Sequence, residues 1–203
     1  MGREWINGGT IRISFLDGNP AQKDKVKEIA VEWTNYANLY FEFTDSPSAE
    51  IRVTFNPNDG SWSYVGTDNL EIPIHAATLN LAWLDEGTIL HQFGHMIGLV
   101  HQHQNPDGGI VWNEQVVIRE LAGPPNYWDE ATTRQHVLYK YSADQLQGTD
   151  FDPDSIMLYP IPPEWTMGGG DTHVNEKLSD LDKQFVRSAM MYPPTDSREP
   201  KSK

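Results

Sequence analysis

The stretch HQFGHMIGLVH, residues 91–101, places three histidines and a glycine at a spacing typical of a metal site. At about 100° per residue in a helix, His91 and His95 lie about 40° apart on one face. Two imidazoles one turn apart can reach the same tetrahedral metal ion. The opposite face of this helix is apolar and is expected to pack on a core: it carries Ile89, Leu90, Phe93, Met96 and Ile97.

Gly98 stands where the helix has to end. Glycine readily takes the left-handed conformation that terminates a helix, so the chain can turn back and bring His101 towards the first two histidines. Three protein nitrogens leave a fourth position of a tetrahedral ion for water, which is the arrangement of a catalytic zinc site and not of a closed structural one. The stretch therefore predicts a site for one Zn²⁺ ion, held by His91, His95 and His101.

The composition narrows the classes of function. The chain has 203 residues, 38% of them hydrophobic, enough for one domain with a sizeable core or for two small lobes. It contains no cysteine, so a metal must be held by His, Asp, Glu or water. The net charge of −14 argues against a nucleic-acid partner. No apolar run is long enough for a membrane span, and the first residues lack the pattern of a secretory signal peptide.

Hydrophobic periodicity predicts strands in the first half of the chain and helices in both halves. Asn19 followed by Pro20 is typical of a helix start, and Ser179 with Asp182 resembles a capping box. The expected strands are 10–16, 39–43, 49–55 and 76–84; the expected helices are 20–38, the motif helix, 113–122, 127–141 and one from Ser179 to about 191. Residues 151–170 are too rich in proline and glycine for regular structure.

The segment SIMLY, residues 155–159, adds a second motif to the histidine stretch. Together they resemble the metzincin zinc endopeptidases, whose signature is His-Glu-x-x-His-x-x-Gly-x-x-His followed by a methionine turn. Tyr159 stands two residues after Met157, as in astacins and serralysins. Three flanking segments also look astacin-like: EWINGGTIRISF (4–15), HQHQNP (101–106) and LSDLDKQFV (178–186).

The resemblance implies an α+β, zincin-like fold. A twisted mixed sheet with helices would form an upper lobe of about 4–98, and an irregular helical lower lobe would cover about 99–193, with the active-site cleft between them. Residues 4–193 would then be a single catalytic domain, and 194–203 a flexible tail. The implied substrate is a polypeptide, a propeptide or inhibitor is a possible partner, and the family points to a secreted protein.

The resemblance also assigns roles to individual residues. His91, His95 and His101 would hold the zinc, with Met157 as a hydrophobic floor beneath it. Tyr159 would be a switch residue that stabilises the oxyanion during turnover. An edge strand would pair with the extended substrate; the residues implied for it are Thr78, Leu79, Asn80, Leu81, Ala82 and Trp83.

Gln92 departs from the family motif, because it stands where the motif has the glutamate that acts as general base. A neutral amide can hydrogen-bond a water molecule but is not a useful base. Losing general acid–base catalysis typically costs about 10²–10⁴ in rate. Zinc binding does not depend on that carboxylate, so we expect an intact metal site and an inactive or very weak catalyst.

Gln102 is a second departure, since the resembling proteins have glutamate after the third histidine. Two origins remain open for Gln92: an engineered substitution that inactivates a protease, or a natural pseudoprotease. Three functions also remain open. They are a zinc endopeptidase with its general base replaced, a zinc-binding module that holds peptides without cutting them, and a domain in which the metal is purely structural.

Overall fold

The computed structural model describes residues 3–124, 126–142, 150–168 and 172–195, which form two compact units. Unit 1 contains the described residues up to Val100 together with those from Glu176 onward, and unit 2 contains those from His101 to Asn175. Within the described residues, none of the helices is both long and apolar enough to cross a membrane.

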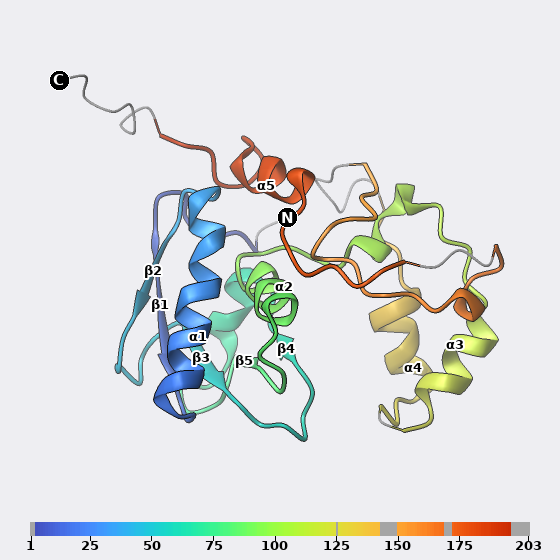
Figure 1. Ribbon diagram of the computed structural model, residues 1–203, viewed down its shortest axis with the longest axis horizontal. Helices are drawn as coiled ribbons and strands as arrows, with labels where there is room; N and C mark the ends of the chain where they lie inside the picture. Colours follow the sequence, from blue (N-terminus) through green and yellow to red (C-terminus); the bar gives the residue numbers. More distant parts are fainter. Residues whose placement is uncertain (1–2, 125, 143–149, 169–171, 196–203) are drawn as a thin grey trace. The chain divides into compact units, whose positions relative to one another are not determined.

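Unit 1 is built on a five-stranded mixed sheet in the order β2-β1-β3-β5-β4 (Figure 1). The strands are β1 (Thr10–Phe15), β2 (Tyr40–Phe43), β3 (Ile51–Thr54), β4 (Trp62–Ser63) and β5 (Leu79–Asn80). The first four strands of that order run parallel, and β4 is antiparallel to β5. The strands expected in 10–16, 39–43 and 49–55 are confirmed, whereas the expected strand 76–84 shortens to two residues and β4 was not predicted.

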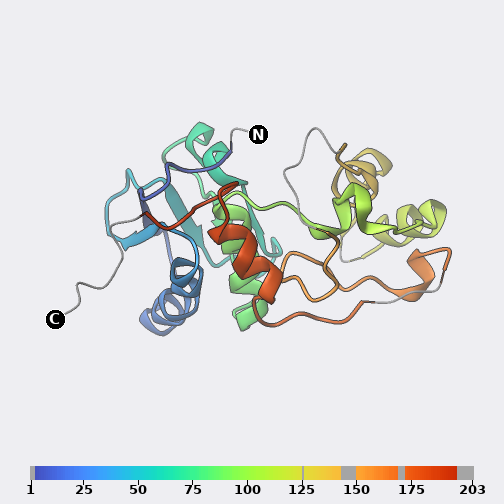
Figure 2. The same ribbon diagram turned by 90° about the horizontal axis from the view of Figure 1, so that it is seen from above.

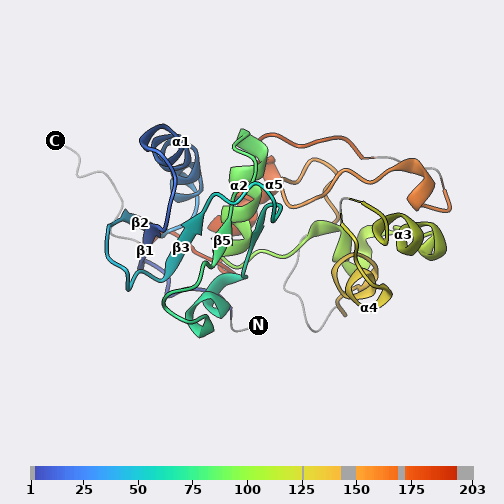
Figure 3. The ribbon, with the colours of Figure 1, turned by 90° about the horizontal axis from the view of Figure 1, so that it is seen from below.

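Two helices cover one face of this sheet, as Figure 3 shows: α1 (Pro20–Ala30) and α2 (Glu86–Met96). Asn19 caps α1 in a capping box with Gln22, so the predicted start is confirmed. The helix predicted to reach residue 38 changes to a 3₁₀ turn after Ala30, at Val31–Asn35. β-branched Val31 and Thr34 and the bulky Trp33 in this segment lower its α-helical propensity.

The apolar face of α2 packs on the sheet. The ring centroids of Phe93 in α2 and Phe41 in β2 are 5.9 Å apart. The residues predicted for this face are all confirmed as buried: Ile89, Leu90, Phe93, Met96 and Ile97. The apolar side chains of α2 and of the sheet pack together in one core. This packing fixes the orientation of α2 on the sheet.

The last described helix, α5 (Asp180–Arg187), belongs to unit 1. Figures 1 and 2 show it above one end of α2. Its predicted capping box between Ser179 and Asp182 is present. The family resemblance implied a lower lobe of about 99–193, which includes 176–193. Here this segment belongs to unit 1, because Tyr192 is fully buried there and its main-chain oxygen accepts from the Asn38 N–H at 3.1 Å. The predicted tail lies largely outside the described residues.

Unit 2 is mostly irregular, as predicted. It contains α3 (Glu114–Leu121), α4 (Glu130–Thr133) and a π-helical turn at Arg134–Leu138, with short 3₁₀ turns at Gln102–Gln104, Pro106–Gly108 and Pro163–Trp165. The predicted helix 113–122 is confirmed with Asn113 as its cap position. The helix predicted over 127–141 is shorter, because Asp129 caps α4 and the chain leaves the helix at Tyr139. The α+β class of the chain is confirmed.

Candidate active site

Helix α2 begins at a side-chain cap. The Asp85 carboxylate accepts the Thr88 N–H at 2.8 Å and the Thr88 hydroxyl at 2.8 Å. This satisfies one of the amide groups that a helix start leaves without a partner. The helix start is therefore determined locally, and it sets the direction in which His91 and His95 project from α2.

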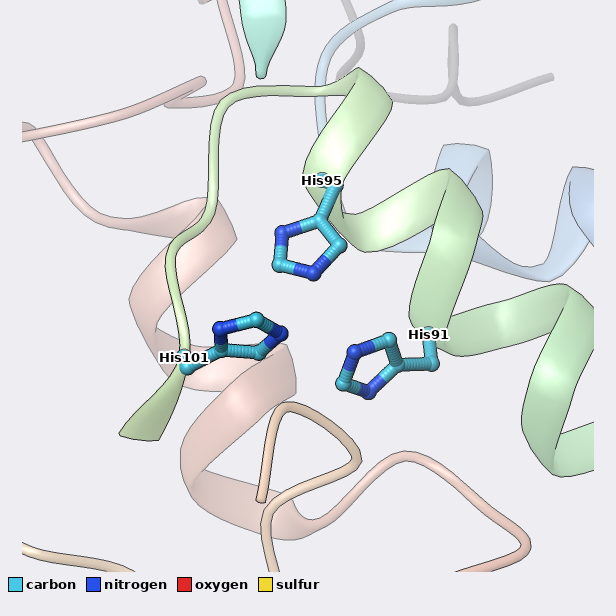
Figure 4. A group of neighbouring side chains, drawn as sticks. All are labelled: His91, His95 and His101. Atoms are coloured by element: carbon cyan, nitrogen blue, oxygen red, sulfur yellow. The ribbon is translucent and has the colours of Figure 1, made fainter. Parts of the chain in front are cut away.

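Three histidines converge next to α2, and Figure 4 shows their rings turned towards one another. His91, His95 and His101 each offer one ring nitrogen, and these three atoms all lie within 4.8 Å of one another. The ring centroids of His91 and His95 are 4.7 Å apart, and the two ring planes are at an angle of 86°. The convergence predicted from the spacing is thus present, and the three histidines could bind a metal ion.

His95 is prepared for ligation by its hydrogen bond. Its Nδ1 lies 2.9 Å from the main-chain oxygen of Leu99. With Nδ1 donating to that oxygen, the lone pair on Nε2 is left for a metal. Burial, reinforced by neighbouring His91, lowers the pKa of His95 to about 3. The imidazole is therefore neutral at physiological pH, which is the form that binds zinc.

The turn that follows α2 is a Schellman motif. The Gly98 N–H donates to His95 O at 2.8 Å, and the Leu99 N–H donates to Gly94 O at 3.0 Å. Gly98 has a φ of +109°, a conformation that side chains rarely adopt. The turn brings the Leu99 oxygen back over His95 and directs the chain towards His101.

The donor set fits zinc. Imidazole nitrogens are preferred zinc ligands, and three of them leave the open position of a catalytic site. The chain has no cysteine to close the site with thiolates. The neutral state of buried His95 removes the competition between a proton and the metal at that nitrogen.

Gln92 lies in α2 directly after His91. It is buried, and its side-chain Nε2 donates to the main-chain oxygen of Ser61 at 3.3 Å. Its Oε1 is also buried and finds no hydrogen-bond donor among the described residues. The amide therefore ties α2 to the residue before β4.

Tyr159 and Met157 lie beside His101 within unit 2. The ring centroids of Tyr159 and His101 are 4.6 Å apart. The Gln102 N–H donates to the main-chain oxygen of Met157 at 2.9 Å. Burial around the phenol raises the pKa of Tyr159 to about 12, although 42% of the residue's surface is exposed. The phenol is therefore protonated at neutral pH and can donate a hydrogen bond.

The structure corrects the position of the edge strand. The residues expected to form it were Thr78, Leu79, Asn80, Leu81, Ala82 and Trp83. Within the described sheet, β5 lies between β3 and β4, and Thr78 to Leu81 are buried. The edge next to α2 is β4 instead, because Trp62 pairs with Asn80 and Ser63 with Leu79. The sequence contains a signal for β4 that was missed: aromatic Trp62 and Tyr64 alternate with serines, a period of two.

Comparisons with known proteins identify the family of this chain. Residues 1–162 match the model of the peptidase family Astacin. The chain is 32% identical over 106 residues, 52% of its length, to the zinc metalloproteinase dpy-31 of Brugia malayi. It spans only 17–27% of the length of the curated zinc metalloproteinases that it matches.

Solved structures share the fold. One is a structure of myroilysin, with a TM-score of 0.89 and 38% identity, covering 95% of this chain and 97% of that chain. Another, similar in fold at 15% identity, is high choriolytic enzyme 1, a hatching enzyme zinc-protease from the medaka Oryzias latipes, with a TM-score of 0.61 over 91% of this chain and 92% of that one. This chain belongs to the astacin family of zinc metalloproteases.

Proposed function

We propose that this chain is the catalytic domain of a zinc endopeptidase whose general base has been replaced by Gln92. One observation carries the proposal. His91, His95 and His101 each place one ring nitrogen within 4.8 Å of the other two. When bound there, zinc supplies Lewis-acid activation of a water molecule and of the scissile carbonyl.

Gln92 supports the second part of the proposal, that catalysis is impaired. Its amide can orient a water molecule by hydrogen bonding, but it cannot take the proton that nucleophilic attack releases. The missing proton transfer raises the barrier by about 2.7–5.5 kcal/mol, equivalent to 10²–10⁴ in rate. The side chain keeps the size of glutamate, so it occupies about the same space in α2.

Tyr159 is the residue that we assign to oxyanion stabilisation. Its phenol is protonated at neutral pH because burial raises its pKa to about 12. A protonated phenol near the third ligand can donate a hydrogen bond to the negative charge that develops on the carbonyl oxygen. Met157 would support the site only by packing, since its side chain is buried and the main chain around it holds His101 in place through Gln102.

The substrate would be an extended polypeptide paired with β4. The Tyr64 N–H donates to Thr78 O at 3.1 Å, so Tyr64 is turned towards β5. By the alternation of an antiparallel pair, the N–H and C=O of Ser63 then point away from β5 and are available for main-chain pairing. A propeptide or an inhibitor could cover the same edge. Membership of the astacin family favours secretion of the protein.

The second candidate is a zinc-binding pseudoprotease that holds peptides without cutting them. The hydrogen bond from Gln92 Nε2 to the Ser61 oxygen favours it, because an amide fits that carbonyl and a carboxylate does not. In this case glutamine would be the native residue at position 92, and the function of the protein would be to bind a peptide along β4.

The test compares the parent chain with Gln92→Glu and with Gln92→Ala as a matched control. Zinc content is measured by elemental analysis, and cleavage of casein is followed by release of acid-soluble peptides. One zinc per chain in all three, with a rate at least about 10²-fold higher in Gln92→Glu alone, supports the impaired protease. Zinc without activity in any variant supports the pseudoprotease, and absence of zinc overturns both.

A further inference from the structure

At the C-terminal end of α2, all five main-chain oxygens from Phe93 to the C-cap residue Ile97 accept hydrogen bonds. Three of the last five are bonded within the turn: Phe93 O accepts from Ile97, Gly94 O from Leu99 and His95 O from Gly98. Among the described residues, no main-chain N–H donates to the remaining two, Met96 O and Ile97 O. A helix end that is buried needs partners for such oxygens.

Two side chains from distant parts of the sequence supply those partners. The indole Nε1–H of Trp5 donates to Met96 O at 2.8 Å, and the Tyr192 hydroxyl donates to Ile97 O at 2.6 Å. The two are also joined to each other, since the Trp5 N–H donates to the Tyr192 hydroxyl oxygen at 3.0 Å. Tyr192 is fully buried. Together they form a closed clamp on the end of α2.

The clamped turn is the one that orients a metal ligand. Leu99, whose oxygen holds Nδ1 of His95, follows the clamped Ile97 by two residues. A shift of the Met96 and Ile97 oxygens would move Gly98 and Leu99, and with them the acceptor that sets the ring orientation of His95. The next ligand, His101, follows Leu99 by two residues.

We propose that Trp5 and Tyr192 are positioning residues of the metal site. They act through the turn after α2, by keeping the Leu99 oxygen where it orients His95 and by directing the chain towards His101. The inference rests on the proposed zinc site and adds to it two residues that contact neither metal nor substrate.

If Trp5 and Tyr192 had a purely structural role, their loss would change stability alone. A variant of Trp33 serves as the control that distinguishes a structural role from a positioning role. Its Nε1–H also donates to a main-chain oxygen of α2, that of Leu90, at 2.9 Å, and its side chain is fully buried. Leu90 lies in the body of α2 and not at the turn. Trp33→Phe therefore removes a similar hydrogen bond from the same helix without touching the turn that orients His95.

The experiment measures the zinc dissociation constant of the parent, Trp5→Phe, Tyr192→Phe and Trp33→Phe by competition with a chromophoric chelator. Urea unfolding of the metal-free forms is measured in parallel. The visible absorption of the Co²⁺-substituted forms reports ligand geometry. We expect zinc affinity to fall about 10–100-fold in Trp5→Phe and Tyr192→Phe, with an altered cobalt spectrum, the range seen when a partner of a metal ligand is lost. Trp33→Phe should lose stability and keep the parent affinity and spectrum.

Zinc binding by Trp5→Phe and Tyr192→Phe with the parent's affinity and cobalt spectrum would overturn the inference and leave the proposed function intact. If Tyr192→Phe does not fold, Trp5→Phe decides the question, because Trp5 is only partly buried and phenylalanine keeps most of its packing. A parent chain that binds no zinc would instead refute the proposed function on which the inference rests.

Discussion

The side-chain Nε2 of Gln92 lies 3.3 Å from the main-chain oxygen of Ser61, and this contact joins the metal-binding helix to the residue that precedes the edge strand. An amide donates in this contact, whereas a carboxylate would place two acceptors against each other. The residue that suits this hydrogen bond is therefore the one that cannot act as a base.

Gln92→Glu should consequently destabilise the metal-free chain. The substitution places a charged oxygen against the buried Ser61 carbonyl, and the expected loss in free energy of unfolding is about 1–3 kcal/mol. Urea unfolding of both metal-free proteins at pH 7.5 measures it. Gln92→Met, which removes donor and acceptor alike, is the control. Equal midpoints for the parent and Gln92→Glu would show that the contact with Ser61 carries no weight.

Metal removal should leave the chain folded. The sheet core, including Ile13, Ile51 and Leu79, contains no metal ligand. Chelation should therefore keep the far-ultraviolet circular dichroism while lowering the unfolding midpoint. Zinc at 100 times its dissociation constant stabilises a folded chain by about 2.7 kcal/mol. Loss of the dichroism on chelation would identify the metal as purely structural.

Replacing any ligand should abolish stoichiometric zinc. His95→Ala removes the ligand held by Leu99, and we expect zinc content to fall well below one per chain after dialysis. His75→Ala is the matched control, because His75 is exposed and lies outside the cluster. Retention of one tightly bound zinc by His95→Ala would show that the cluster of histidines is not the site.

Arg52 should be far more important for stability than Arg12. Within the described part of the chain, the acceptors of its buried guanidinium are all main-chain oxygens: those of Ala49, Glu50, Ile72, Pro73 and Ala76. Arg52→Met leaves these acceptors without a donor and should lower the free energy of unfolding by on the order of 3 kcal/mol. Arg12→Met, which breaks a half-exposed ion pair, should cost about 0.2–1 kcal/mol. Urea unfolding of the two variants gives the comparison, and similar losses would contradict it.

Gly98→Ala should strain the turn after α2. A Cβ there would meet its nearest neighbour, Arg3 O, at an ordinary 3.5 Å, so the cost comes from the φ of +109° and not from a clash. We expect a loss of about 1 kcal/mol or more in the free energy of unfolding. Gly123→Ala, at a glycine without a positive φ, is the control and should be close to neutral. A neutral Gly98→Ala would contradict the torsional argument.

Local signals in the sequence were sufficient for the parts of the fold that short-range chemistry determines. Asn19 followed by Pro20, and the capping box of Ser179 and Asp182, marked two helix starts because each signal needs only residues within one helix turn. The spacing of His91, His95 and His101 predicted their convergence because one helix turn and one glycine turn produce it.

Long-range pairing was not accessible in the same way. Residues 78–83 were mistaken for the edge strand because alternation shows that a strand exists and not where it lies in the sheet. β4 has only two residues, Trp62 and Ser63, too few for a periodic signal to dominate. Trp5 and Tyr192 gave no local sign of their hydrogen bonds to the end of α2, since the partners lie 91 and 95 residues away.

The separation of Tyr192 from Ile97 also has a consequence for the order of events during synthesis. A growing chain cannot close that hydrogen bond until 95 more residues have been added after Ile97, a delay of about 5 to 20 seconds at ordinary rates of translation. For nearly all of that interval the three histidines already exist, but the turn between them lacks its last donor. Final ordering of the metal-binding turn is thus postponed until Tyr192 has been synthesised.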